Sequence, residues 1–286
     1  MSPGVHSAVD ILMYHSIAAG RGPTCTSPET FREQLRILAG EGYRAIPLRD
    51  LARALRGEAV ELPERPVVLT FDDGFADFAD VAAPELAARG WTATVFLPAG
   101  KLGGVDDWES RAGRRPRRLL TWERASELGR AGIDLGAHGV SHADLTRLAP
   151  EAARAEVSGA RRLSEERTGC PVTSFAAPYG RSDAGVKAEA ARGYEAAVGT
   201  ILGRAAPGSD LYDLPRIEMA YFRAPRRWRE YLAHGSSGYF MLRRELRRLR
   251  GLAAGAGARR RGPVSAVAAG FSRSPDGGSQ GPWPRS

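Results

Sequence analysis

Short apolar segments with strand character alternate along the first 200 residues with segments of helical periodicity. The strand-like segments span residues 9–14, 43–47, 67–71, 92–97, 134–137, 173–176 and 196–198. The helical segments span residues 31–40, 48–55, 84–89, 122–131, 150–168 and 184–192. Such alternation is typical of βα units, whose strands pair in parallel. Six or seven units are too many for a simple three-layer sandwich of this length. The sequence therefore predicts an α/β barrel with mainly parallel strands.

Positive charge is concentrated near the C-terminal end of the chain. The formal net charge of the 286 residues is +8, yet residues 223–286 alone hold 14 arginines and three acidic residues. The preceding part is slightly acidic, so the high isoelectric point does not indicate a nucleic-acid-binding protein. We expect no nucleic-acid partner. We also expect no transmembrane helix, because no stretch approaches the ~18 consecutive apolar residues that one needs.

We expect three parts: a barrel over residues 9–222, a basic amphipathic helical extension over 223–253, and a disordered tail over 254–286. The extension includes a predicted Arg-rich helix at 239–252. Such a helix can be solvated, dock on the barrel or on a partner protein, or make peripheral contact with an anionic membrane. The sequence leaves these alternatives open.

The compartment is predicted from the cysteines and the N-terminal residues. Cys25 and Cys170 are the two cysteines of the chain, too few for a disulfide framework. The first residues contain neither a basic segment nor an apolar core of a signal peptide. We therefore expect a cytoplasmic protein.

Two adjacent carboxylates, Asp72 and Asp73, follow the apolar strand at 67–71 in the motif TFDDG. In a turn at the strand end both can face one site. Close carboxylates repel unless a cation lies between them. A divalent metal satisfies this requirement, with one carboxylate as ligand and the other acting on water. The alternative is an ordinary surface turn.

Two of the five histidines, His138 and His142, lie four residues apart directly after the strand at 134–137. At this spacing both can lie on one face of a helical turn and bind one metal. Two imidazoles and one carboxylate with an open position are typical of a catalytic hydrolase site. Two independent surface histidines are the alternative.

Two further strand ends carry candidate residues. Pro178 and Tyr179 follow the strand at 173–176, where such a turn can present a backbone N–H to an oxyanion or be an ordinary turn. His15 follows the first strand. A lone histidine there is often structural, but in a barrel it would face the same mouth as the other motifs and can act as a general acid.

The motifs TFDDG, HGVSH and AAPYG together resemble the polysaccharide deacetylases of carbohydrate esterase family 4, the NodB-like domain, over roughly residues 9–220. The ILMYHSI opening, the segment 93–108 and residues 214–217 resemble the branch that includes poly-N-acetylglucosamine deacetylases. The resemblance implies a distorted (β/α)7-type barrel. It also implies a divalent metal, Zn²⁺ or another such as Co²⁺ or Ni²⁺. The implied reaction removes N-acetyl groups from N-acetylated amino sugars.

The resemblance also implies roles for residues of the first two motifs. Asp73, His138 and His142 would bind the metal, and Asp72 would be the general base that takes a proton from water. Ser141 would steady the histidine loop by a hydrogen bond.

The remaining roles implied by the resemblance concern the oxyanion, the leaving amine and the sugar. The Tyr179 backbone N–H, after Pro178, would help to hold the oxyanion. His15 would protonate the leaving amine, although His234 also fits the family's Leu-x-His pattern and is a rival. Trp108 would stack on a sugar ring or pack in the interior.

One position departs from the family pattern. An arginine that pairs with the base often stands two residues before the proline of the third motif, and here Ala176 occupies that position. We hypothesise that Arg216 replaces it. The sequence leaves two alternatives to the deacetylase: a hydrolase of small-molecule amides on the same scaffold, and a non-catalytic carbohydrate-binding relative.

Overall fold

The computed structural model of the chain describes residues 8–20, 22, 24–108, 116–235, 238 and 240–246. The chain divides into two compact units, residues 1–237 and 238–286. In the second unit residues 240–246 are helical, within the helix expected at 239–252. The rest of that helix and the expected tail at 254–286 lie outside the described residues.

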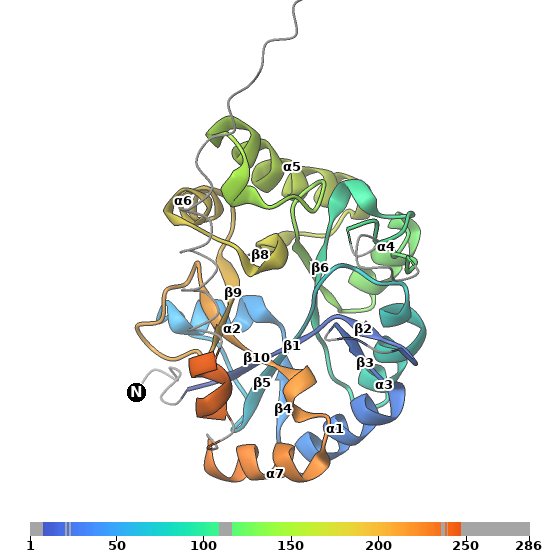
Figure 1. Cartoon of the computed structure of the whole chain (residues 1–286), viewed down its shortest axis with the longest axis vertical. Coiled ribbons are helices and arrows are strands. Elements are labelled where there is room, and N and C mark those ends of the chain that lie inside the picture. Colours follow the sequence, from blue (N-terminus) through green and yellow to red (C-terminus); the bar gives the residue numbers. More distant parts are fainter. Residues whose placement is uncertain are drawn as a thin grey trace, which may run out of the picture. The chain divides into compact units, whose positions relative to one another are not determined.

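Parallel strands form a closed barrel in the first unit (Figure 1). Its strands are β1 (Asp10–Tyr14), β5 (Pro66–Phe71), β6 (Thr94–Leu97), β7 (Asp134–Ala137), β8 (Val172–Ala176), β9 (Ala196–Leu202) and β10 (Leu214–Glu218). They pair in the order β1-β10-β9-β8-β7-β6-β5, and β1 also pairs with β5. Leu12 of β1 is in register with Ile217 on one side and with Leu69 on the other, which closes the ring.

The barrel is distorted where β4 (Arg44–Ile46) joins it. β4 pairs with the first half of β5, whereas β6 pairs with the last two residues of β5. The predicted distorted (β/α)7-type barrel with mainly parallel strands is thus confirmed. No strand is predicted from the sequence at residues 214–218, where the structure has β10, and β10 completes the ring between β9 and β1. A separate two-stranded sheet, β2 (Ser16–Ile17) with β3 (Cys25–Thr26), follows β1.

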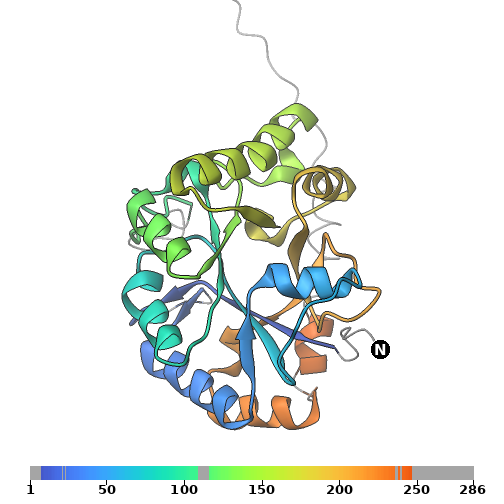
Figure 2. The same ribbon diagram turned by 180° about the vertical axis from the view of Figure 1, so that it is seen from behind.

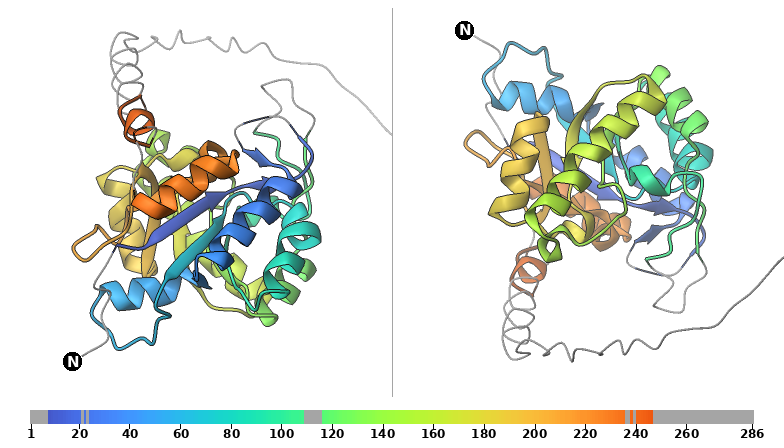
Figure 3. Two further views of the ribbon diagram at one scale, coloured as in Figure 1. Left: turned by 90° about the horizontal axis from the view of Figure 1, so that it is seen from below. Right: turned by 90° about the horizontal axis from the view of Figure 1, so that it is seen from above.

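Helices pack around the barrel (Figures 1, 2 and 3). They are α1 (Pro28–Gly40), α2 (Leu48–Leu55), α3 (Ala83–Ala87), α4 (Trp122–Arg130), α5 (Pro150–Thr168), α6 (Ala184–Gly193) and α7 (Pro225–His234). α1 illustrates how the local sequence sets an element. The Ser27 side chain caps the helix by accepting from the Thr30 N–H, and Phe31, Leu35 and Leu38 form its buried face.

An apolar cluster fills part of the barrel interior. One buried cluster draws Ile11, Val68, Phe96 and Val198 from four different strands, so it lies inside the ring. α2 adds its own buried leucines to the same cluster, and the N–H of Leu48 donates to the Thr94 hydroxyl. This packing leaves the polar chemistry to the loops at the carboxyl ends of the strands.

α7 lies in the same compact unit as the barrel, beside α1 (Figures 1 and 2). The Tyr231 hydroxyl donates to the buried Asp10 carboxylate at 2.6 Å, and Arg204 donates to it at 2.9 Å. Asp10 begins β1, so this contact fixes the C-terminal end of α7 at the amino-terminal end of the barrel strands. His234 lines a cavity of about 370 Å³ there together with Asp10. The expected boundaries at 222 and 253 stay predictions.

Replacing Tyr231 by phenylalanine tests the attachment of α7. The change removes a hydrogen bond to a buried carboxylate while keeping the ring, so we expect a loss of about 1–3 kcal/mol in the free energy of unfolding. Urea denaturation measures it. Tyr212→Phe, at a half-buried tyrosine, is the matched control and is expected to change stability by less than about 0.5 kcal/mol. Equal stability of the Tyr231→Phe and unmodified proteins would contradict this attachment.

Candidate active site

The residues singled out in the sequence meet at one end of the barrel, because parallel strands bring their carboxyl ends to the same face. His15 follows β1, Asp72 and Asp73 follow β5, and Trp108 lies in the loop after β6. The HGVSH loop follows β7, and Pro178 and Tyr179 follow β8. Arg216 reaches the same mouth from within β10.

Asp73, His138 and His142 form a buried group whose ligand atoms all lie within 4.8 Å of one another. Asp73 Oδ1 is 3.2 Å from His138 Nε2 and 3.1 Å from His142 Nε2. Burial by itself would raise the pKa of Asp73, but hydrogen bonds from the two imidazoles hold that pKa well below its ordinary value. One carboxylate oxygen and two imidazole nitrogens are a donor set that suits a divalent transition metal.

The orientation of His138 also suits a metal ligand. Its Nδ1 donates to the Ala176 carbonyl oxygen at 2.8 Å, since a carbonyl only accepts. In the protonated ring Nε2 also donates to Asp73, and in the neutral ring with Nδ1–H the lone pair of Nε2 is available to a metal. A metal-binding histidine is commonly held by such a hydrogen bond from its second nitrogen. Ala176, which replaces the family's arginine, thus contributes through its backbone.

His142 lies between two aromatic rings. Trp108 stacks on it with ring centroids 3.9 Å apart and planes 16° apart, and Tyr179 meets it edge-on at 4.8 Å. The sequence left Trp108 open between sugar stacking and interior packing. In the structure its side chain is half-buried, with one face against a candidate metal ligand. A sugar ring has access to the opposite face at most.

Three site residues adopt left-handed backbone conformations. The φ angles are +72° at Asp73, +60° at His142 and +61° at Tyr179, and no other non-glycine residue in the described part of the chain has a positive φ. Such conformations are costly and persist where the surrounding structure enforces them, often at functional sites. Their coincidence with the sequence motifs is an independent indication that this mouth is functional.

Glu156 of α5 holds the histidine loop, and the sequence does not predict this role. Its carboxylate accepts the backbone N–H groups of Val140 and Ser141 at 2.8 and 2.9 Å. It also accepts the Ser141 hydroxyl at 2.7 Å. The expected hydrogen bond of Ser141 thus has a specific partner. Glu156 lies in a helix rich in charged residues, so nothing in the local sequence distinguishes it.

Asp72 lies beside the metal-binding group and is held by a buried arginine. Arg216 donates to both carboxylate oxygens of Asp72, at 2.7 and 2.8 Å, and its Nε donates to the Gly199 carbonyl. Arg216 is 1% exposed. Burial would raise the pKa of Asp72, but the charge and hydrogen bonds of Arg216 outweigh it and lower that pKa. The pairing hypothesised for Arg216 is therefore present.

The two candidate acids lie at opposite ends of β1. His15 Nε2 is 3.9 Å from Asp72 Oδ2, and the His15 side chain is 15% exposed. His234 lies with Asp10 at the amino-terminal end of β1. The structure therefore brings His15 into the site and leaves His234 outside it.

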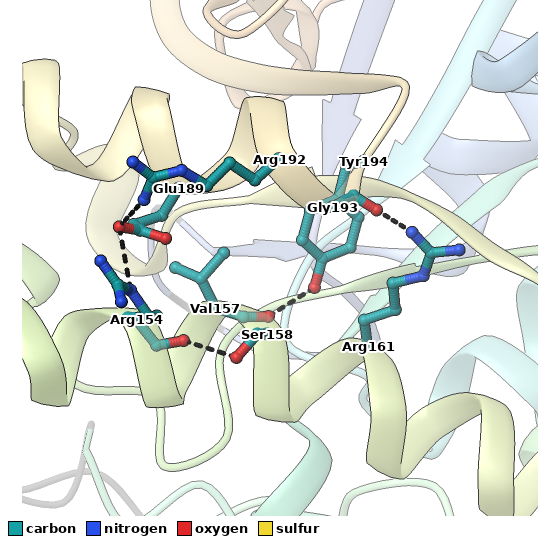
Figure 4. A pocket seen from close by; sticks show the side chains of 8 residues that line it. All are labelled: Arg154, Val157, Ser158, Arg161, Glu189, Arg192, Gly193 and Tyr194. Atoms are coloured by element: carbon teal, nitrogen blue, oxygen red, sulfur yellow. Dashed lines mark hydrogen bonds and ion pairs between the residues drawn. The ribbon is translucent and has the colours of Figure 1, made fainter.

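A second hollow, away from the barrel mouth, lies between α5 and α6 (Figure 4). This groove of about 460 Å³ is lined by three arginines, of which Arg154 and Arg192 pair with the same oxygen of Glu189. Arg161 donates to the Gly193 carbonyl. The groove is lined by none of the candidate site residues predicted from the sequence.

Comparison with known proteins gives concordant matches. A family model described as polysaccharide deacetylase matches residues 59–197. "Putative polysaccharide deacetylase YxkH" of Bacillus subtilis (strain 168) is 28% identical over 211 residues, which cover 73% of this chain and 71% of the relative. Poly-beta-1,6-N-acetyl-D-glucosamine N-deacetylase of Escherichia coli (strain K12) is 30% identical over 146 residues. That match covers 48% of this chain but 21% of the E. coli protein.

Two solved structures show the same fold. The Streptococcus pyogenes deacetylase PplD, in complex with acetate, has a TM-score of 0.63 at 27% identity, over 74% of this chain and 92% of that one. IcaB from Ammonifex degensii has a TM-score of 0.65 at 20% identity, over 79% of this chain and 96% of that one, and shows the fold alone. The family model, the relatives and the fold agree that this chain is similar to polysaccharide deacetylases, and together they support an N-deacetylase enzyme.

Proposed function

We propose that the protein is a metal-dependent hydrolase that removes N-acetyl groups from N-acetylated amino sugars. The observation that carries this proposal is the buried Asp73–His138–His142 group beside an Asp72 held by Arg216. A polysaccharide, an oligosaccharide or a sugar conjugate would fit the family. A small-molecule amide on the same scaffold is the second candidate. A non-catalytic carbohydrate-binding relative would be expected to lack a ligand or the base, and this chain has both.

Zn²⁺ is the metal that we propose for this group, with Co²⁺ or Ni²⁺ as alternatives. Asp73, His138 and His142 would hold it, and they leave part of its coordination shell open to substrate and water. When bound, such an ion supplies a Lewis acid that polarises the acetyl carbonyl and makes water more acidic.

In this proposal Asp72 is the general base. A base must be ionised before it takes a proton from water, and the lowered pKa of Asp72 keeps it so at neutral pH. Arg216 also fixes the direction of the carboxylate, because two parallel hydrogen bonds leave it little rotational freedom.

His15 is the proposed general acid, which gives a proton to the leaving amine nitrogen as the amide C–N bond breaks. It lies beside Asp72 and is partly accessible from the mouth. The backbone N–H of Tyr179, in the turn set by Pro178, would donate to the oxyanion. Acetate and the free amine are the products.

Location and membrane contact stay predictions. Among the described residues, no helix is long and apolar enough to span a bilayer. A cytoplasmic location and peripheral membrane contact through the Arg-rich segment at 223–253 are the corresponding proposals.

Acetate release tests the proposed reaction. The substrates are N-acetylglucosamine oligomers and N-acetylated monosaccharides, with protein stripped by a chelator and refilled with Zn²⁺. We expect metal-dependent release that Asp72→Asn lowers by about 10²–10⁴-fold, because the amide cannot take up the proton. Metal content should stay unchanged in this variant. No release from any sugar by metal-loaded protein would favour the small-amide alternative.

Metal content tests the ligand assignment independently of activity. Asp73→Asn, His138→Ala and His142→Ala should each weaken Zn²⁺ binding by more than about 100-fold, since even outer residues around a metal contribute 10–100-fold. Titration calorimetry and atomic absorption measure this. His234→Ala changes a histidine outside the site and should bind one ion per chain like the unmodified protein. Full Zn²⁺ binding by all three ligand variants would refute the assignment.

The pH dependence of kcat/KM tests the pairing of Arg216 with the base. In Arg216→Ala the burial of Asp72 is no longer offset, so its pKa should rise. Activity should then be lost at a higher pH as the solution is acidified. Arg216→Lys, which keeps the charge without the two parallel bonds, should show a smaller shift.

Arg204→Ala is the matched control for Arg216, because Arg204 pairs with the buried Asp10 at the other end of the barrel. It should lower stability and leave the acid limb unchanged. Full activity of Arg216→Ala with an unchanged pH profile would exclude a role for Arg216.

A further inference from the structure

Asp77 lies in the segment after β5 that also carries Asp72 and Asp73, and it has no role in the proposed reaction. It follows the TFDDG motif by three residues and precedes a short π-helical turn at Phe78–Ala82. Its Oδ2 accepts the Ser16 hydroxyl at 2.5 Å and its Oδ1 accepts the Ile17 N–H at 2.9 Å. One carboxylate thus joins the segment after β5 to both residues of β2.

β2 follows His15 directly, so its position governs where His15 lies. Ser16 and Ile17 are fully buried, and β2 pairs with β3 in a sheet separate from the barrel. That sheet consists of two residues on each strand. Such a short pairing restrains the chain weakly, and the two hydrogen bonds to Asp77 add a link to the barrel segment that carries the base.

The chain is also fixed on the other side of His15. The N–H of Asp72 donates to the Tyr14 carbonyl at 3.0 Å, within the pairing of β1 with β5. His15 therefore lies between two attachments to the segment after β5. Tyr14, before it, is bonded to Asp72, and the β2 residues after it are bonded to Asp77. Both attachments come from the stretch that contains Asp72, whose carboxylate lies 3.9 Å from the imidazole.

We propose that Asp77 is a positioning residue that holds His15 in register with Asp72 through Ser16 and Ile17. This inference rests on the proposed function only where His15 is called the acid. Proton transfer needs donor and acceptor in a narrow range of distance and angle, and a misplacement of about 1 Å can cost ~100-fold in rate. A two-point attachment reduces the freedom of the loop without occupying the mouth.

A double-mutant cycle separates positioning from general stabilisation. Asp77→Ala should lower kcat about tenfold and change KM and Zn²⁺ content less than twofold. In a His15→Ala background the same change should lower kcat less than twofold, because its effect passes through His15. Asp77→Asn should recover most of the activity, since its amide oxygen still accepts from Ile17. Equal losses in both backgrounds would overturn the proposal.

Two further variants control the cycle. Asp80→Ala removes an exposed acid three residues further on and should have no effect. Ser16→Ala removes one of the two hydrogen bonds and leaves the carboxylate, so it tests the link even if Asp77→Ala does not fold. It should give an intermediate loss of kcat. Full activity of Ser16→Ala would overturn the proposal.

A readout without turnover distinguishes failure of this inference from failure of the proposed function. The His15 ring resonances and the exchange rate of the Ile17 amide are measured by NMR in the unmodified protein, in Asp77→Ala and in Asp80→Ala. We expect shifted or broadened His15 signals and at least tenfold faster Ile17 exchange in Asp77→Ala alone. If the protein deacetylates no sugar, these signals still test the attachment. Unchanged signals in Asp77→Ala would refute it.

Discussion

The buried ion pair of Arg216 and Asp72 is the interaction on which the site depends. Both side chains are almost fully buried, so neither charge is tolerable without the other. The pair bridges two strands, β10 and β5, that lie on either side of β1. It can form only because β1 closes the ring between them. The orientation of the base Asp72 therefore depends on the closure of the barrel.

The strands β10, β1 and β5 carry one group of site residues, and the candidate metal ligands form a second group. β10, β1 and β5 supply Arg216, His15 and Asp72: the proposed acid is His15, the proposed base is Asp72, and Arg216 holds the base. The candidate metal ligands come from β5 and β7, so the adjacent carboxylates of TFDDG stand where the two halves meet. The left-handed backbone at Asp73 turns the chain between them, and Gly74 continues the turn with a φ of +62°. Repulsion between the two carboxylates is avoided because arginine faces one and two imidazoles face the other.

The sequence predicts this site as far as local patterns reach. Strand–helix alternation predicts a barrel, and motifs at strand ends predict a shared mouth, since parallel strands point the same way. Arg216 was proposed from a resemblance and an absent arginine, and no local pattern indicates its reach to Asp72. Glu156 and Asp77 were not found at all. Each acts across the fold on a backbone N–H or a hydroxyl, contacts that depend on tertiary structure and have no signature in neighbouring residues.

The choice between the two histidines shows what topology adds to a motif. His234 fits Leu-x-His by sequence, and nothing in that pattern tells where the residue lies. β1 shows where each histidine lies, because it runs through the barrel from one end to the other. The first residue of β1, Asp10, accepts a hydrogen bond from the Tyr231 hydroxyl of α7. His15, which directly follows β1, lies next to Asp72. A helix anchored at the start of β1 carries its own histidine to that end. The geometry therefore supports His15 as the acid, and it makes the loop after β1, held by Asp77, part of the catalytic apparatus in the proposed reaction.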